Sequence, residues 1–314
     1  MAHHYLPAGP DTVHWGHFDP AAAPVLRIAA GDTVQIDTLS GGPRNLPDAG
    51  QGSVLPNHRA ALAALAQDLG PHLVTGPIHV EGAVPGDRLI VDIVSVELSQ
   101  NWGWNAIEPG FGAFPDLATE YENMIIPIDI ARSRAALPWG VNVDLHPFFG
   151  ILAVAPELAT GRIGTVVPGA FGGNMDNRFA RAGASLHLPV FCEGALFFAG
   201  DGHALQGNGE VCDTALETAL NGRFRFRLEK GTAPRAPEIH RDDLLVTMAF
   251  DPDLDRAAVE ATSRMMDILT AQTPLSRREA WRHCSLCADL HITQLVNGKK
   301  GVHCTLRRAT LPQD

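Results

Sequence analysis

The residue types best suited to chemistry stand in one glycine-rich segment of the chain. It reads Gly200-Asp201-Gly202-His203-Ala204-Leu205-Gln206-Gly207-Asn208-Gly209-Glu210. Asp201 and His203 are two residues apart, so a β-strand would place both side chains on one face. A carboxylate with an imidazole suits zinc or a similar divalent metal, and flanking glycines let the backbone approach an ion closely. A tight turn with a capping aspartate and a surface histidine would fit the same spacing, so two interpretations are open.

A second polar cluster has the same character. It reads Gly172-Gly173-Asn174-Met175-Asp176. Asn174 and Asp176 offer oxygen ligands at a spacing of two, although an Asx-turn would also account for them. Asp176 and Asp201 are 25 residues apart in an apolar stretch, where a cation would offset the cost of burying carboxylates. Because metal sites are assembled from separated segments, the two clusters together favour one shared metal site.

Other hydrolytic mechanisms lack their residues. The sequence has no Gly-x-Ser-x-Gly nucleophile elbow, and its only lysines are Lys230, Lys299 and Lys300. An amidase mechanism with an early catalytic lysine is therefore excluded. Cys192 has apolar neighbours that would not stabilise a thiolate, so we interpret it as a structural residue.

The C-terminal cysteines have the spacing of a zinc knuckle, Cys284-x-x-Cys287-x-x-x-His291. The large apolar residues around them instead indicate a core helix, in which cysteine behaves as a small hydrophobic side chain. Glycine-rich loops of the nucleotide-binding types are missing, so no nucleotide cofactor is implied.

Short strands separated by Gly/Pro turns must position the two polar clusters. The segments Gly31–Asp37 and Gly86–Asp92 share a pattern of turn, strand and closing aspartate, which fits two equivalent hairpins of a β-sandwich. The alternation of Arg and Phe from Arg223 to Leu228 predicts an amphipathic strand. We therefore predict a mainly β protein, with a β-sandwich-like body of short strands and a smaller α+β C-terminal part.

Helices are expected at three places. Asn57 would cap a helix over 58–68, and an apolar periodicity predicts a second helix over 254–270. Ser276 and Glu279 form a capping box that opens a third helix toward Leu290, followed by a strand over 292–296. The Pro-rich stretch 232–237 is the best candidate boundary, which gives a β-rich catalytic body at 1–231 and an α+β subdomain at 238–314 packed on it.

The amino-acid composition limits the classes of partner that the chain could bind. The 314 residues carry 24 Lys and Arg against 35 Asp and Glu, a net charge of −11, so nucleic acid and anionic membranes are not expected as partners. No apolar run reaches the ~18 residues of a membrane span. The five cysteines are an odd number, which suggests reduced thiols and a cytoplasmic location.

At these residues the sequence resembles the acetamidase/formamidase family over nearly its whole length. The resemblance rests on motifs in the family's order, namely His14-Trp15-Gly16-His17-Phe18-Asp19, Thr75-Gly76-Pro77, Val80-Glu81-Gly82-Ala83, Pro85-Gly86-Asp87, Pro109-Gly110-Phe111-Gly112, the cluster at 172–176, Gly194-Ala195-Leu196-Phe197, the segment at 200–210, Cys284-Ser285-Leu286, Asp289-Leu290 and Thr293-Gln294. Such a resemblance implies a β-rich fold, a cytoplasmic homo-oligomer, and metal-dependent hydrolysis of small aliphatic amides such as formamide and acetamide.

Three positions depart from the family pattern. Asn208 stands where an aspartate is expected, His79 stands where an aromatic hydroxyl is common, and Cys192-Glu193 is an unusual lead-in to Gly194-Ala195. We expect these positions to touch the site region, so they bear on substrate identity more than on fold.

Our hypothesis for the site combines both lines of argument. A divalent metal, zinc first with calcium or another ion as alternatives, is held by Asp176, Asp201 and His203. It polarises the amide carbonyl and lowers the pKa of water. Asn174 is an auxiliary ligand or orients the carbonyl.

A carboxylate outside the ligand set completes the hypothesis. Glu210 or Glu81 takes the proton of the attacking water and passes it to the leaving ammonia. Two alternatives stay open. One is a hydrolase of a larger amide, carbamate or related C–N compound, with Trp102 and Trp104 lining its pocket, and the other is a non-catalytic homologue that binds a small ligand or metal.

Overall fold

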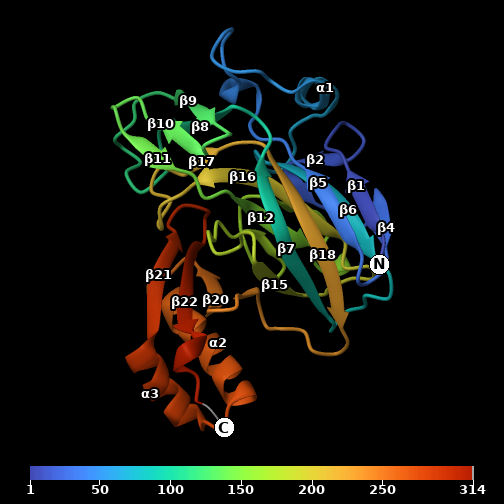
Figure 1. Ribbon diagram of the computed structural model, residues 1–314, viewed down its shortest axis with the longest axis vertical. Coiled ribbons are helices and arrows are strands. Elements are labelled where there is room, and N and C mark those ends of the chain that lie inside the picture. The colour runs from blue at the N-terminus through green and yellow to red at the C-terminus, as the bar shows by residue number, and fades with distance from the viewer. Residues whose placement is uncertain (313–314) are drawn as a thin grey trace.

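Two large β-sheets make up most of the protein (Figure 1). The structure is a computed structural model, and it describes residues 1–312. The first sheet has nine strands, in the spatial order β1 (His3–Leu6), β5 (Thr33–Asp37), β18 (Leu220–Glu229), β7 (Arg88–Leu98), β15 (Ala184–Pro189), β19 (Glu238–His240), β20 (Leu244–Asp251), β22 (Lys300–Arg307) and β21 (Ala288–Gln294). The two Gly-Asp segments of the sequence form β5 and β7, and both pair with β18.

The second sheet has eleven strands and carries both polar clusters. Its main path is β11 (Asn142–Asp144), β10 (Arg134–Ala136), β9 (Glu122–Asp129), β8 (Trp102–Ile107), β17 (Leu216–Glu217), β16 (Phe197–Leu205), β12 (Phe148–Val154) and β14 (Gly172–Asn174). Strand β6 (Leu73–Val80) pairs with β16, β2 (Val13–Trp15) and β4 (Leu26–Ile28). A separate two-stranded pair joins β3 (His17–Phe18) to β13 (Ile163–Gly164).

The inner faces of the two large sheets enclose the main hydrophobic core. Phe224 and Phe226 of β18 face Phe149 of β12 and Phe197 of β16, with ring centroids 5.4 Å apart for Phe149–Phe224 and 5.1 Å apart for Phe197–Phe226. The arginines that alternate with these phenylalanines point outward. The predictions of a mainly β fold and of an amphipathic strand here are confirmed, because alternate residues of a strand face opposite sides of the sheet.

The C-terminal residues extend the first sheet and cover its outer face with two helices (Figure 1, orange and red). Helices α2 (Leu254–Gln272) and α3 (Arg277–Cys287) pack on β20 and β22 through a second apolar cluster. Strand β19, directly after the Pro-rich stretch, pairs with β15 of the body. The C-terminal part is thus hydrogen-bonded to the body, while its division at 232–237 into two domains stays a prediction.

The predictions of α2 and α3 are confirmed. The predicted bounds are wrong at the end of α3 and for the first helix. Helix α2 matches the prediction and α3 opens on the predicted capping box, but α3 ends at Cys287 because β21 begins at once to pair with β22. Helix α1 spans Pro56–Ala64, with Leu55 as its N-cap. Asn57 lies inside this helix and donates to the Ala8 carbonyl instead of capping, because Pro56 takes the first helical position.

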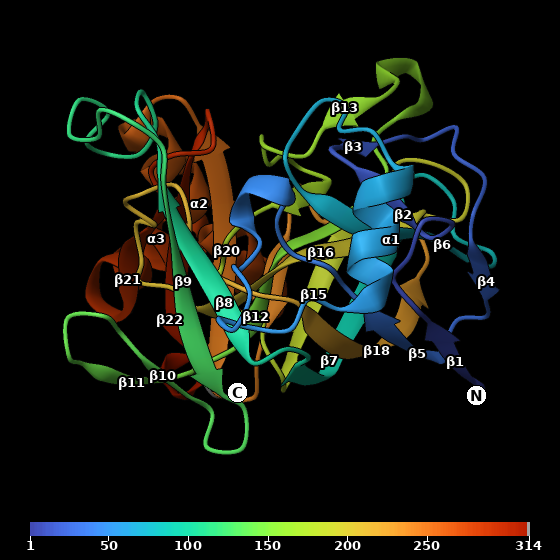
Figure 2. The same ribbon diagram turned by 90° about the horizontal axis from the view of Figure 1, so that it is seen from above.

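Figure 2 shows α1 over the second sheet, on the side away from α2 and α3. Three short 3-10 helices span Pro43–Asn45, Leu158–Thr160 and Arg308–Thr310. Within residues 1–312 no helix is both long and apolar enough to span a membrane.

The capping box of α3 gives a test of the C-terminal part. The Ser276 hydroxyl accepts from the N–H of Glu279 and the Glu279 carboxylate accepts from the N–H of Ser276. Replacing Ser276 by Ala should lower the free energy of unfolding by about 1 kcal/mol, whereas Thr should keep most of it. Urea unfolding of both variants measures this, and equal stabilities for Ala and Thr would contradict the cap.

Candidate functional site

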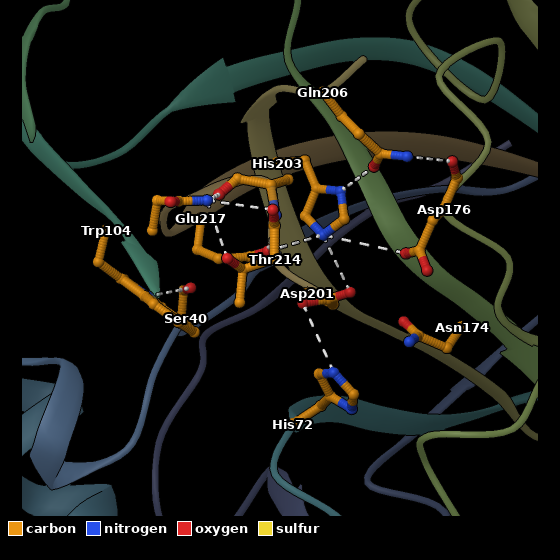
Figure 3. Close-up of polar contacts among 12 residues, drawn as sticks. Ser40, His72, Trp104, Asn174, Asp176, Asp201, His203, Gln206, Thr214 and Glu217 are labelled. Atoms are coloured by element: carbon orange, nitrogen blue, oxygen red, sulfur yellow. Dashed lines mark hydrogen bonds and ion pairs between the residues drawn. The ribbon is translucent and has the colours of Figure 1, made fainter. Parts of the chain in front are cut away.

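Strand β16 presents Asp201 and His203 side by side in the second sheet (Figure 3). The Nε2 atom of His203 lies 3.1 Å from Oδ2 of Asp201, and both side chains are buried. The expectation that a strand would bring the two residues together is confirmed, and the alternative of a surface histidine is wrong. Nε2 of His72, the residue directly before β6, lies 4.0 Å from Oδ1 of Asp201.

The second polar cluster reaches the same point through β12 and β14. Asn174 of β14 pairs with Ile151 of β12, which in turn pairs with Gly200 of β16. Oδ1 of Asp176 lies 3.9 Å from Nε2 of His203. Residues far apart in the chain therefore meet around one imidazole, as the sequence predicted for Asp176, Asp201 and His203.

Gly150 of β12 makes room for this meeting. A Cβ atom added there would stand 2.6 Å from Oδ1 of Asp176 and closer still to Oδ2 of Asp201. Its carbonyl also accepts from the N–H groups of Met175 and Asp176, at 3.0 and 3.2 Å. A glycine is required because any side chain would occupy the space between the two carboxylates, and the sequence held no sign of this role.

Two glutamates complete the cluster, and sequence reasoning had found only one of them. Oε1 of Glu217, on β17, lies 3.3 Å from Nε2 of His203. Ligand atoms of Glu210, Asp176 and His203 lie within 4.8 Å of one another. Among residues 1–312, neither Oε2 of Glu210 nor Oε2 of Glu217 has a hydrogen-bond partner, although both are buried. Glu217 could have been suspected only as a lone acid in the apolar run Ala215–Leu220.

Glu81, the other glutamate named as a proton acceptor, does not join the cluster. It is exposed in the turn after β6. Its negative charge acts on the pKa of His79, which it raises, and not on the groups of the cluster. The turn that follows Val80 carries Glu81 out to solvent. Of the two candidate bases, the structure brings only Glu210 to the other site residues.

Gln206 sets the tautomer of His203. Its Nε2 donates to the carbonyl of Asp176 at 3.0 Å, which turns its Oε1 toward Nδ1 of His203 at 2.8 Å (Figure 3). Nδ1 must therefore carry the proton that it donates to Gln206. Nε2 is therefore the nitrogen that faces the surrounding carboxylates, and in the neutral ring it is the one that would ligate a metal while the other nitrogen is held.

Burial and mutual charge shift the pKa values of these groups. Burial opposes a charge on His203, but Glu217 and Asp201 hold its pKa well above the usual value. Burial would raise the pKa of Asp201, yet His203 and His72 lower it to about 2. Burial is the main cause that raises the pKa of Asp176 to about 6 and that of both glutamates well above the usual range. The four carboxyl groups of the cluster carry more potential negative charge than the single imidazolium of His203 can neutralise.

Asn174 shows a related imbalance. Its amide oxygen faces only acceptors and its amide nitrogen faces only donors. Turned over, the amide would donate to Oδ2 of Asp201 at 2.9 Å and to Oδ1 of Asp176 at 3.3 Å. Oxygens that face one another repel unless a hydrogen or a cation lies among them. Because the turned amide satisfies both of its atoms, its oxygen accepting from Nδ2 of Asn297 at 3.0 Å, Asn174 acts as a hydrogen-bond donor to the two carboxylates.

The donor set fits a divalent cation. One imidazole nitrogen and several carboxylate oxygens converge, two buried carboxylate oxygens lack partners, and Gly150 leaves the space open. This combination of nitrogen and oxygen donors is typical of zinc sites, and uncompensated buried carboxylates are otherwise costly. No cysteine takes part in any of the candidate clusters found within residues 1–312.

A cavity of about 690 Å³ opens onto the cluster. Asn174, Asp201, Glu210 and Glu217 lie in its wall together with Trp104. Trp102, the first residue of β8, does not line it, because its ring is fully buried and donates to the carbonyl of Ser53. Of the two tryptophans considered from the sequence, one lines the pocket and the other is core.

The three positions that depart from the family pattern do not line the cavity. His79 packs against Gly194 and Cys192 is half-buried, with its pKa raised by burial to about 11. Neither they nor Asn208 are among the cavity-lining residues of the described chain. The expectation that these positions touch the site is therefore not met for the cavity: His79 lies on β6, and Cys192 and Asn208 lie in the segments before and after β16.

Fold and site together define a β-sandwich protein with a buried acid–histidine cluster at the end of a cavity. The family model for acetamidases and formamidases matches residues 10–161 and 157–253, and the chain belongs to this acetamidase/formamidase family. An acetamidase of Mycolicibacterium smegmatis is 29% identical over 203 residues, which cover 46% of this chain and 50% of that protein. The chain spans about half the length of the curated relatives it matches.

Solved structures agree over the whole chain. A predicted acetamidase/formamidase from Thermoanaerobacter tengcongensis superposes with a TM-score of 0.85 at 27% identity, covering 99% of this chain and 98% of that one. An acetamidase from Yersinia enterocolitica gives 0.86 at 25% identity, with 99% and 93% covered.

Gly150 gives a test of the site's geometry. Replacing it by Ala should push the Asp176 and Asp201 carboxylates apart, lowering both the free energy of unfolding, by about 1–3 kcal/mol, and the bound divalent metal per chain. Gly207→Ala is the matched control, since a Cβ there would meet nothing within 4 Å. Urea unfolding and elemental analysis measure both effects, and a Gly150→Ala protein equal to the control would show that the close approach is not needed.

Proposed function

We propose that this protein hydrolyses the C–N bond of amides, releasing ammonia and a carboxylate, with a divalent cation held by Asp176, Asp201 and His203. The observation that carries the proposal is the meeting of these three side chains around an imidazole nitrogen at the end of a cavity. Membership of the acetamidase/formamidase family and the names of its relatives support the reaction class. Small aliphatic amides are the first substrates to assay.

A cation in this cluster supplies Lewis acidity toward an amide carbonyl and lowers the pKa of water. The protein holds the ligand side chains in fixed positions. Gln206 fixes the imidazole, Gly150 lets the carboxylates approach, and Asn174 orients both carboxylates through its amide N–H groups. Glu217, whose Oε1 also accepts from the N–H of Ala215, is anchored as a further oxygen donor. Zinc is our first choice because an imidazole is present, and calcium remains a rival.

Glu210 is the proposed general base. It lies in the cavity wall, one of its carboxylate oxygens lies within 4.8 Å of ligand atoms of Asp176 and His203, and its Oε2 is free of partners among residues 1–312. Burial raises its pKa well above the usual value, which suits a group that must accept a proton and return it to the leaving ammonia. Glu217 serves less well, because its contacts with His203 and Ala215 hold one of its oxygens.

A cytoplasmic location and a homo-oligomer are also part of the proposal. The five cysteines all have free thiols, which suits a reducing compartment. Phe114, Leu117 and Trp139 are 68%, 78% and 64% exposed, and large exposed apolar side chains often mark a contact with another subunit.

Metal removal tests the proposal first. Dialysis against a strong chelator should abolish ammonia release from formamide and acetamide, and Zn²⁺ added back should restore it. Elemental analysis before and after gives the metal content, and Asp201→Asn, which weakens a ligand, should lose metal and activity together. Undiminished hydrolysis by metal-free protein would reject the scheme.

Glu210→Gln separates an enzyme from a mere binder. If Glu210 is the base, this variant should keep its metal while kcat falls by about 10²–10⁴. Elemental analysis and ammonia release measure the two quantities. Glu97→Gln, an exposed change on β7, is the control. Loss of metal in Glu210→Gln would make Glu210 a ligand instead, and unchanged kcat would remove it from the mechanism.

A further inference from the structure

The turn between β21 and β22 reaches from the C-terminal part of the chain to the site (Figure 1, red). The N–H of Gly209 donates to the carbonyl of Thr293 at 2.9 Å, and the N–H of Leu295 donates to the carbonyl of Gly209 at 3.0 Å. Nε2 of Gln206 also donates to the carbonyl of Thr293, at 3.5 Å. These hydrogen bonds attach the turn to the segment 200–210, which carries much of the cluster.

Asn297 lies in this turn and forms part of the cavity wall, where it is only 4% exposed. Its Nδ2 atom donates to Oδ2 of Asp176 at 2.5 Å and to Asn174, through the main-chain carbonyl at 3.2 Å and the turned amide oxygen at 3.0 Å. An ionised carboxylate and a carbonyl only accept, so the nitrogen of the Asn297 amide, and not its oxygen, faces them. One side chain from the C-terminal part thus holds both polar residues of the second cluster.

Gln294 fixes the backbone of the turn from which Asn297 extends. Its side chain is fully buried, and its Oε1 accepts from the N–H groups of Val296 and Asn297 at 2.7 and 3.1 Å. Its Nε2 donates to the carbonyl of Lys299 at 2.7 Å. Because one buried amide binds the turn on both sides of Asn297, the side chain of Asn297 extends from a backbone that is held in place.

The two carboxylate oxygens of Asp176 have different partners. Oδ2 accepts the hydrogen bond from Asn297, whereas Oδ1 lies 3.9 Å from Nε2 of His203. A carboxylate rotates as a unit about its Cβ–Cγ bond, so a donor that holds one oxygen also sets the direction of the other. Hydrogen-bond partners of metal-binding carboxylates act in this way, and their removal typically weakens metal binding by about 10–100-fold.

We propose that Asn297 is a positioning residue of the cation site, which holds Asp176 with its Oδ1 toward His203. The inference rests on the proposed function, in which Asp176 is a ligand of the cation. In this role Asn297 acts through Asp176 and is not itself a ligand. The C-terminal part of the chain then contributes a side chain to the site as well as extending the first sheet.

Zinc affinity measures this role without relying on turnover. Replacing Asn297 by Ala should raise the dissociation constant for Zn²⁺ by about 10–100-fold, because Asp176 loses the donor that orients it. Competition with a chromogenic chelator gives the constants, at a temperature where circular dichroism shows the variants to be folded. Asn101→Ala, an exposed change directly before β8, is the control and should bind Zn²⁺ like the unaltered protein. Equal constants for Asn297→Ala and the control would overturn the inference.

A double-mutant cycle separates positioning from a general structural role. In a chain that already carries Asp176→Ala there is no carboxylate to orient, so adding Asn297→Ala should change the Zn²⁺ dissociation constant by less than about twofold. A second loss as large as that in the single variant would show that Asn297 does not act through Asp176. If the unaltered protein binds no divalent cation, the proposed function itself fails, whereas tight binding that Asn297→Ala leaves unchanged defeats only this inference.

Discussion

The crowding of buried carboxylates around one imidazole nitrogen is the constraint on which the rest of the structure depends. Carboxylate oxygens of Asp176, Asp201 and Glu217 all lie within 3.9 Å of Nε2 of His203. His203 and Asp176 are each only 1% exposed. Burying several acids without compensation costs several kcal/mol per charge, so the cluster can persist only with protons or a cation among its oxygens. The absent Cβ at Gly150 lets the carboxylates approach one another, and the amide of Gln206 fixes the ring that they surround.

The backbone around the cluster is strained in a way that the core must offset. Asp176, Asp201 and Glu210 have φ values of +49°, +54° and +42°, in the left-handed region that non-glycine residues rarely adopt. Each such residue costs of order 1–3 kcal/mol. Of the three, Asp201 lies on β16, Asp176 follows β14, and Glu210 lies in the segment between β16 and β17. The aromatic core between the two sheets, built from β12, β16 and β18, supplies the rigidity that keeps these residues in place.

Sequence reasoning could find the parts whose signal is local. The alternation in β18, the capping box of α3 and the glycine-flanked pairs at 174–176 and 201–203 all follow from spacing of two or of helical period. Glu217 and Gly150 escaped, because their roles arise from pairing of strands distant in the chain, and a single sequence carries no register. Glu81 was named for its motif, and the turn after β6 exposes it. Asn57 has the residue type of a cap, but Pro56 takes the first helical position and Leu55 is the N-cap.

Chemistry and specificity are built from different kinds of segment. The residues that surround His203 come from β12, β14, β16 and β17 or from the turns that directly follow them, so hydrogen-bonded strands fix their positions. The outer cavity walls come largely from connecting segments, including 39–45, 67–72 and 108–121. Loops tolerate substitution and insertion far better than paired strands do. A chain of this family can therefore keep the cluster while the loops change the size and charge of the cavity, so family membership constrains the reaction more tightly than it constrains the substrate.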